Sequence, residues 1–432
     1  MKPIDSQKFL QYFDQDFRLV KEHEFRKALF YDGINENYRQ IVWRFLFHFY
    51  SFKSTKRERF IKRNEKLVQY ELLKERWSKI YQNILNLKVK EEEYDTIASP
   101  MVDFTCPIDL NNDYYDNSSR SVENLFEEKQ DIDLGYLKIQ SLLNVSRRRI
   151  NNTKLMNDIK QIDKDLERTT YLIEIEEKDL ADKTKIKNSL RNILITFSAF
   201  NQSSSDEMSN NGCFDLGYTQ GMNEIASVFL SVFDQESIAY WCFSNYMLKD
   251  SYSKSMLTLN TTQITDNHSL KINAAHYFSD SGMSKKISHL KYLFGIIDPE
   301  YYQKLASIDL DHFNFCHEWL ILNFKRCFYS TNEYQKCFEV LSSRYIEFYN
   351  ATLKNINVKN LYNFDLFICI SLMFQLRNQV LNEIENEMCF FEIFSQFNKS
   401  HYFEKNFKKV VQNAQEIFDK YCIISHSVNL NN

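Results

Sequence analysis

The sequence predicts a protein built almost entirely of α-helices, on two observations. Glycine and proline are scarce: the chain has 7 Gly and 4 Pro in 432 residues, well below their usual shares of about 7% and 5%, which leaves few sites for tight turns. The segments with regular apolar spacing follow the 3.6-residue period of a helix. A hydrophobic fraction of 44%, with 36 Phe and 26 Tyr, can fill a large core.

Composition argues against several classes of function. A formal net charge of -4 gives no overall attraction to nucleic acid, although basic runs such as Arg147 to Arg149 occur. The 9 Cys are odd in number and form no CxxC pair, and the 9 His form no HExxH motif, so neither a zinc site nor a disulfide framework is expected. The strongest apolar run, Leu366 to Phe374, is too short to cross a bilayer. We therefore expect a soluble cytoplasmic protein with no metal and no transmembrane segment.

The first elements are a lead segment and an amphipathic helix. Residues 1–30 are expected to form a short helical lead segment that packs on the next part of the chain. The helix that comes next has its apolar stripe at Tyr38, Ile41, Val42, Phe45, Leu46 and Phe49. Arg39 and Trp43 share a second face of this helix, where we expect them to brace neighbouring elements.

Two polar inserts interrupt the helices. After a charged helix through Leu67 and Trp77, residues 88–133 are acidic and rich in Asn, Asp and Ser, so we expect a mobile insert. Residues 250–269 are expected to form a second surface loop, and residues 426–432 a C-terminal tail.

A helix with Leu155, Ile159, Ile162 and Leu166 on one face lies between the inserts. At about 100° per residue, Arg168 lies some 200° from Leu166, which puts it on the solvent side. The plainest interpretation of Asp165 and Arg168 is a surface ion pair, worth about a few tenths of a kcal/mol.

A glycine-flanked turn, Gly217 to Gly221, precedes another helix, whose apolar positions begin at Met222. The turn carries Tyr218 and Gln220. From spacing alone it is an ordinary helix-entry turn in which Tyr218 anchors the packing.

Later segments complete the helical pattern. Helical spacing returns from Phe313 to Phe324, and the helix from Phe364 to Leu376 is apolar nearly all round, so it should be central to the core. No internal repeat is seen, which argues against an α-solenoid adaptor.

Three stretches together resemble the TBC domain, the all-helical module of Rab GTPase-activating proteins. The first is GINENYRQIVWRFL, which matches at Gly33, Arg39 and Trp43. The second is IDKDLERT, which matches I-x-x-D-x-x-R-T at Ile162, Asp165, Arg168 and Thr169. The third is GYTQGM, which matches G-Y-x-Q-G-M from Gly217 through Met222. The sequence departs from the family pattern at Asn35, Leu166 and Phe338, and none of these is a proposed catalytic position.

This resemblance implies an all-α TBC domain over residues 31–425 that activates a Rab-family small GTPase in vesicle trafficking. It implies that Arg168 serves as an arginine finger and that Gln220 orients the attacking water. Motif support or partner contact is implied for Arg39, Trp43, Asp165, Thr169, Gly217, Tyr218 and Gly221. The chain would need no cofactor of its own, because GTP and Mg²⁺ belong to the GTPase, and recruitment to endomembranes stays open. The alternatives are an inactive Rab-binding scaffold and a helical adaptor.

Overall fold

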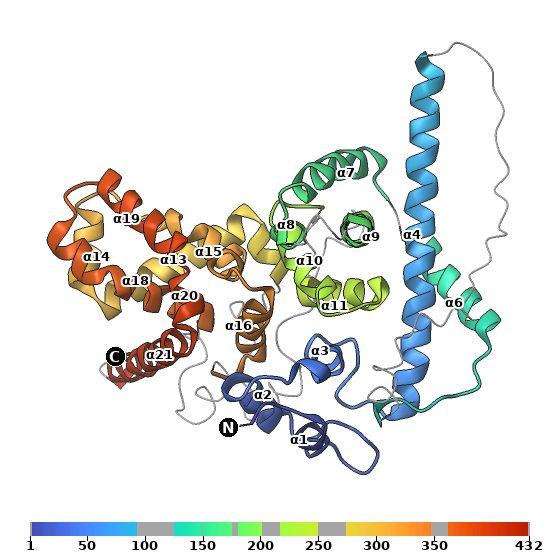
Figure 1. The fold of residues 1–432 in the computed structure, drawn as a ribbon, viewed down its shortest axis with the longest axis horizontal. Coiled ribbons are helices and arrows are strands. Elements are labelled where there is room, and N and C mark those ends of the chain that lie inside the picture. Colours follow the sequence, from blue (N-terminus) through green and yellow to red (C-terminus); the bar gives the residue numbers. More distant parts are fainter. Residues whose placement is uncertain are drawn as a thin grey trace. The chain divides into compact units, whose positions relative to one another are not determined.

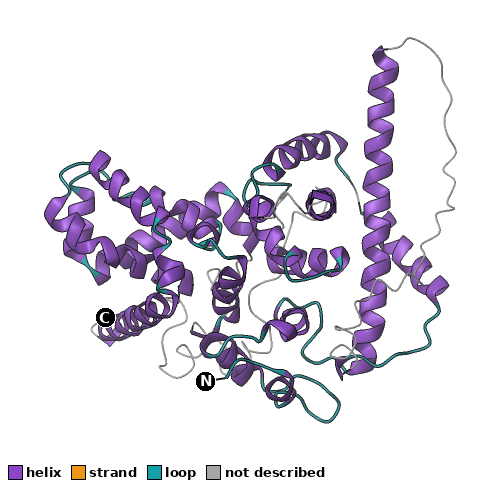
Figure 2. Ribbon diagram, in the orientation of Figure 1, coloured by secondary structure: helices purple, strands orange, loops and turns teal. Residues whose placement is uncertain are grey.

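The computed structural model describes residues 2–92, 125–148, 150–174, 180–200, 217–248, 274–346 and 362–430. Within these ranges all regular secondary structure is helical, and only two isolated bridges, Ile4–Ile34 and Phe13–Leu19, have strand-like pairing. Figures 1 and 2 show this helical architecture. The predicted all-α fold class is confirmed.

The chain forms two compact units. The central unit comprises residues 13–20 and 37–244, and the terminal unit comprises residues 1–12, 21–36 and 245–432. Residues 1–12 and 21–30 of the predicted lead segment lie in the terminal unit and residues 13–20 lie in the central unit, and the domain boundary at residue 30 stays a prediction.

The central unit contains the helices that carry the second and third motifs. In chain order, its helices are α3 (Arg39–Leu46), α4 (Lys56–Glu92), α6 (Leu134–Ser146), α7 (Asn152–Leu166), α8 (Thr170–Glu174), α9 (Leu180–Phe200), α10 (Met222–Leu230) and α11 (Glu236–Leu248), which continues into the terminal unit. A short 3₁₀ turn, η1 (Glu36–Tyr38), precedes α3. Helix α9 packs against α7, α10 and α4, and α10 also contacts α7 and α8. These contacts bring the end of α7 beside the start of α10.

The terminal unit is organised around α18. Its helices are α1 (Ser6–Leu10), α2 (Glu22–Tyr31), α13 (Asp280–Ile297), α14 (Pro299–Ala306), α15 (His317–Ile321), α16 (Thr331–Ser343), α18 (Phe364–Glu383), α19 (Glu387–Lys399), α20 (Tyr402–Lys405) and α21 (Phe407–Leu430), with 3₁₀ turns η4 (Ala274–Phe278), η5 (Asn314–Cys316) and η6 (Lys325–Cys327). Helix α18 packs against α21, α14, α15 and α13. Among the described helices it alone is long and apolar enough to span a membrane, but 67% of its apolar window is buried in the fold. It is the central core helix that the sequence predicted.

The first insert is shorter than predicted. Helix α4 continues to Glu92, inside the predicted insert. Near the other end of the insert Phe126 is fully buried, so the chain is already part of the packed fold at that residue. The Glu127 carboxylate accepts from the Tyr50 hydroxyl and lies 3.0 Å from Arg63 Nε. Residues 93–124, like the second insert at 250–269, lie outside the described residues.

Three other element boundaries differ from the prediction. The amphipathic helix ends at Leu46, and His48 has a left-handed φ of 55°. The segment from Phe313 to Phe324 forms a short 3₁₀ turn and the short helix α15, and the positive φ of Phe313 and of Phe324 bounds it at both ends. The predicted tail at 426–432 is helical as far as Leu430, the end of α21.

Buried tyrosines predict a loss of stability at alkaline pH. Burial raises the pKa of Tyr12, Tyr240 and Tyr246 to about 12, with the charges of Asp32 and Glu24 adding to the rise at Tyr12. A folded-state pKa above the unfolded value of about 10 contributes stability that is fully present below pH 10 and is lost as pH rises from about 10 to 12. Urea midpoints are therefore expected to fall between pH 9 and pH 12. Ionisation of all tyrosines near pH 10, with the helical circular dichroism unchanged, would contradict this.

Candidate functional site

Helix α7 ends just before Arg168. The side chain of Asn151 caps the helix at its start, accepting from Lys154 N at 3.1 Å, and the buried stripe holds the helix against its neighbours. The last helical residue is Leu166, and Arg168 lies in the following turn, where its backbone N–H donates to Asp165 O at 3.2 Å. Arg168 is exposed as predicted, but the predicted reason is wrong, because the helix has ended and the turn sets the exposure.

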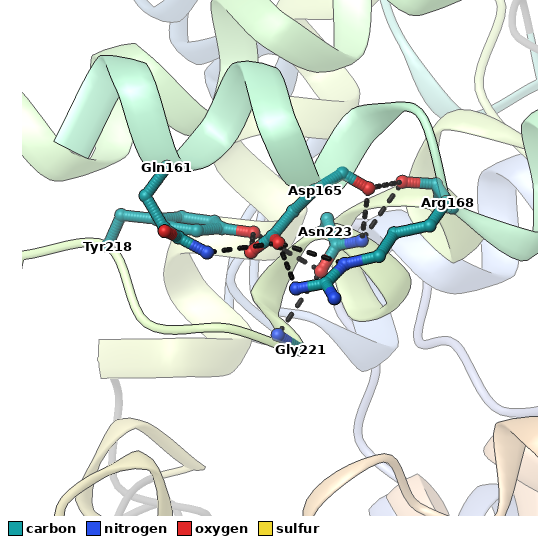
Figure 3. Close-up of polar contacts among 7 residues, drawn as sticks. Gln161, Asp165, Arg168, Tyr218, Gly221 and Asn223 are labelled. Atoms are coloured by element: carbon teal, nitrogen blue, oxygen red, sulfur yellow. Dashed lines mark hydrogen bonds and ion pairs between the residues drawn. The ribbon is translucent and has the colours of Figure 1, made fainter.

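Asp165 is fully buried and anchors Arg168. Its Oδ1 accepts from Arg168 Nε at 3.1 Å, from Arg168 Nη2 and from Gln161 Nε2 at 3.0 Å. Its Oδ2 accepts from the Tyr218 hydroxyl at 2.9 Å (Figure 3). The Arg168 side chain is 49% exposed and the Asp165 side chain 0%. The predicted ion pair is present, but it is not a surface pair, because one partner is a buried carboxylate with donors from two segments.

Tyr218 joins the glycine-flanked turn to α7. Its backbone N–H donates to Asp158 Oδ2 at 3.0 Å, and its hydroxyl reaches Asp165. Burial, and then the negative charge of Asp165, raise the pKa of the Tyr218 hydroxyl. The hydroxyl therefore keeps its proton at neutral pH and remains a hydrogen-bond donor.

The two glycines of the turn have different surroundings. A Cβ on Gly217 would lie 2.5 Å from Lys154 Cε and 2.6 Å from Asp158 Oδ2, both side chains of α7. Gly221 stands at the N-cap of α10 with φ 100°, a conformation that other residues rarely adopt. The turn is thus held against α7 and then reverses into α10.

Gln220 lies on this turn with its side chain exposed. Within the described ranges its side chain makes no hydrogen bond. Because its neighbours Tyr218 and Gly221 are both fixed, the exposed amide is presented from a well-defined backbone.

Arg39 and Trp43 have a different setting. Trp43 is fully buried and packs edge-on against Phe47 and Phe229, with ring centroids 5.0 and 5.8 Å apart. Arg39 is also buried on α3. Trp43 thus packs α3 against α10, and contact of Arg39 or Trp43 with a partner stays a prediction.

Comparison with known proteins identifies the family. The Rab-GTPase-TBC domain family matches residues 134–354, which include Arg168 and Gln220. The chain belongs to this family. The family match begins after the motif that contains Arg39 and Trp43.

Individual relatives agree with this TBC assignment. The chain is 23% identical to TBC1 domain family member 25 of Mus musculus over 327 residues, 76% of this chain and 30% of that protein. It is 23% identical to TBC1 domain family member 16 of Homo sapiens over 322 residues, 74% of this chain and 29% of that protein. The chain thus spans about 30% of the length of these curated relatives.

The solved structure of the Ypt/Rab-GAP domain of Gyp1p has a similar fold. It aligns with a TM-score of 0.51 at 13% identity, covering 95% of this chain and 98% of that one. At this identity the match supports the TBC fold alone.

Two residues of the TBC site, Asn223 and Glu224, were missed from the sequence. Asn223 Nδ2 donates to Thr169 Oγ1 at 2.9 Å, and its Oδ1 accepts from Gly221 N at 3.2 Å. Glu224 Oε1 accepts from Thr170 N at 3.1 Å and from Thr170 Oγ1 at 2.8 Å. The available signal was a pair of polar residues at buried positions of an otherwise apolar helix start. Together they attach the first turn of α10 to the segment that comes after Arg168.

In the TBC domain, Tyr218→Phe should destabilise the fold. The change removes a donor to fully buried Asp165, so we expect a loss of about 1–3 kcal/mol in the free energy of unfolding. Urea unfolding measures the loss. The matched control is Tyr292→Phe, whose tyrosine is 54% exposed and which should leave the midpoint unchanged. Equal midpoints for the two variants would show that the Tyr218 hydroxyl has no structural role.

Proposed function

We propose that this TBC domain stimulates GTP hydrolysis by a Rab-family small GTPase, with Arg168 and Gln220 entering the GTPase site. The observation that supports this is the connection between the two exposed side chains. Arg168 is held by buried Asp165, Asp165 accepts from Tyr218, and Tyr218 stands two residues before Gln220. Both side chains are therefore exposed, while Asp165 holds the Arg168 side chain and Tyr218 holds the turn that carries Gln220.

Arg168 suits a site where negative charge develops on phosphate oxygens. Its guanidinium uses Nε and Nη2 to hold Asp165, while Nη1 makes no hydrogen bond within the described part of the chain. Nη1 is thus available to donate outward. Arginine fingers supplied in trans raise the rate of hydrolysis by about 10³ to 10⁵.

Gln220 suits the second task, which is to orient the attacking water. A primary amide can accept a hydrogen bond from water and donate another at the same time. The amide oxygen and the amide nitrogen of exposed Gln220 are both free of hydrogen bonds to other described residues, so the oxygen can accept and the nitrogen can donate. GTP and Mg²⁺ would be bound by the GTPase, and this chain would supply side chains only.

The cellular setting belongs to the proposal as well. With a Rab partner, the chain would act in vesicle trafficking, from the cytoplasm and with recruitment to endomembranes.

Of the described residues, no group of three or more His, Cys, Asp or Glu could hold a metal ion.

The test is single-turnover GTP hydrolysis by a panel of Rab GTPases, with and without saturating amounts of this protein. We expect at least one Rab to be accelerated by about 10³-fold or more. A Rab that binds in its GTP form with no acceleration would instead favour the scaffold. No binding and no acceleration across the panel would reject both.

A further inference from the structure

Helix α6 has two apolar faces, and the described residues cover only one of them. Leu137, Ser141 and Val145 are buried at intervals of four residues, and α6 packs against α4. The Arg76 guanidinium of α4 donates to Val145 O near the end of α6. Figure 1 shows α6 alongside α4 within the central unit.

The other face carries an exposed apolar row. Tyr136, Ile139 and Leu143 are 64%, 62% and 56% exposed. At about 100° per residue their mean direction lies about 170° from that of the buried row. Three large apolar side chains at i, i+3 and i+7 on one helix face are the pattern by which a helix packs against another helix.

The two ends of α6 carry opposite charge. Four exposed charged residues precede or cap it: Glu128, Lys129, Asp131 and Asp133, a net charge of -2. Exposed Arg147 and Arg148 follow it, a net charge of +2. An anionic lipid surface would attract one end and repel the other. An antiparallel copy of the same helix would instead place each acidic end beside a basic end.

We propose that the exposed row of α6 docks against α6 of a second copy of this chain, antiparallel about a two-fold axis. In such an interface the same patch serves on both copies. Tyr136 of each copy then lies near Leu143 of the other, with the two Ile139 side chains near the axis. The contact is small, so the dimer is expected to be weak, with a dissociation constant on the order of 10 μM.

Sedimentation velocity of the full chain from about 1 to 100 μM tests this. The wild type is expected to shift from monomer to dimer over this range. Ile139→Asp should raise the dissociation constant by about thirtyfold or more, because each change enters the interface twice. Ile423→Asp is the matched control, since Ile423 is 67% exposed on α21, and it should dimerise like the wild type. Circular dichroism checks that each variant keeps its helical content.

Charge exchange tests the antiparallel arrangement. One variant, Glu128→Lys with Asp131→Lys, makes both ends of α6 positive, and a second, Arg147→Glu with Arg148→Glu, makes both negative. Each variant alone should be monomeric at 100 μM, and their mixture should form a heterodimer. A parallel pairing would leave each variant as associated as the wild type.

Several results would overturn the proposal. They are a wild type that stays monomeric at 100 μM, dimerisation that survives Ile139→Asp, and failure of the two charge variants to associate. Binding of the wild type but not Ile139→Asp to phosphatidylserine vesicles, without dimerisation, would assign the row to a lipid surface instead.

Discussion

Replacing Arg168 with Ala is expected to lower stimulated GTP hydrolysis by about a hundredfold or more. The reason is that the Ala variant presents no cation to the phosphates, whereas the wild-type guanidinium is half exposed and has Nη1 available. Arg168→Lys keeps the charge but loses the planar fork, so a fall of at least about tenfold is expected. Single-turnover hydrolysis with saturating protein measures both changes.

The Ala change also leaves buried Asp165 without its cation, which calls for a control. The double variant Arg168→Ala with Asp165→Asn removes the buried charge together with the arginine. If loss of the finger explains the rate, the double variant should be as slow as Arg168→Ala, whatever its stability. If the double variant recovers stimulation, the slow rate of Arg168→Ala would instead be explained by the unpaired buried carboxylate of Asp165 distorting the site.

Binding should survive the loss of Arg168 better than rate does. An interaction made chiefly in the transition state lowers turnover without an equal loss of ground-state affinity. Arg168→Ala should therefore still capture its GTP-loaded Rab in a pull-down. Full stimulation by the Ala variant would eliminate the finger and leave Arg168 as a partner of Asp165 alone.

Gln220→Ala should remove most of the stimulation, by about tenfold or more, while the free energy of unfolding barely changes. The side chain is exposed and makes no hydrogen bond in the described ranges, so the fold does not depend on it. The matched control is Gln82→Ala, an exposed glutamine of α4, which should alter neither quantity. Normal stimulation with reduced stability would make the turn a packing element, as its spacing alone suggested.

Some of the site was accessible from the sequence and some was not. Arg168 and Gln220 were predicted from motifs, because a short pattern of residue types can be recognised in a single sequence. The burial of Asp165 was not accessible, because a carboxylate can be buried only with donors, and one of its donors, Tyr218, lies 53 residues later. Helical spacing carries no information about such a distant partner.

The same limit explains the fold boundaries. The all-α class follows from periodicity and from the scarcity of Gly and Pro, which are local properties. Phe126 and Glu127 lie in a stretch of insert-like composition, yet both are buried. Glu127 can be buried because Tyr50 and Arg63, from distant parts of the chain, pair with its carboxylate. Likewise, Phe313 and Phe324 continue a helical pattern in sequence while adopting positive φ in the fold.

The anchoring of Arg168 by Asp165 also has an entropic consequence. A free arginine side chain carries about 2 kcal/mol of rotamer entropy, which is lost when the guanidinium is fixed. Here part of that freedom is already given up when the chain folds, since Nε and Nη2 hold a buried carboxylate. An incoming GTPase would therefore have less disorder to remove. Weakening the anchor should then appear as a less favourable entropy of association, even where the enthalpy of the new contact is unchanged.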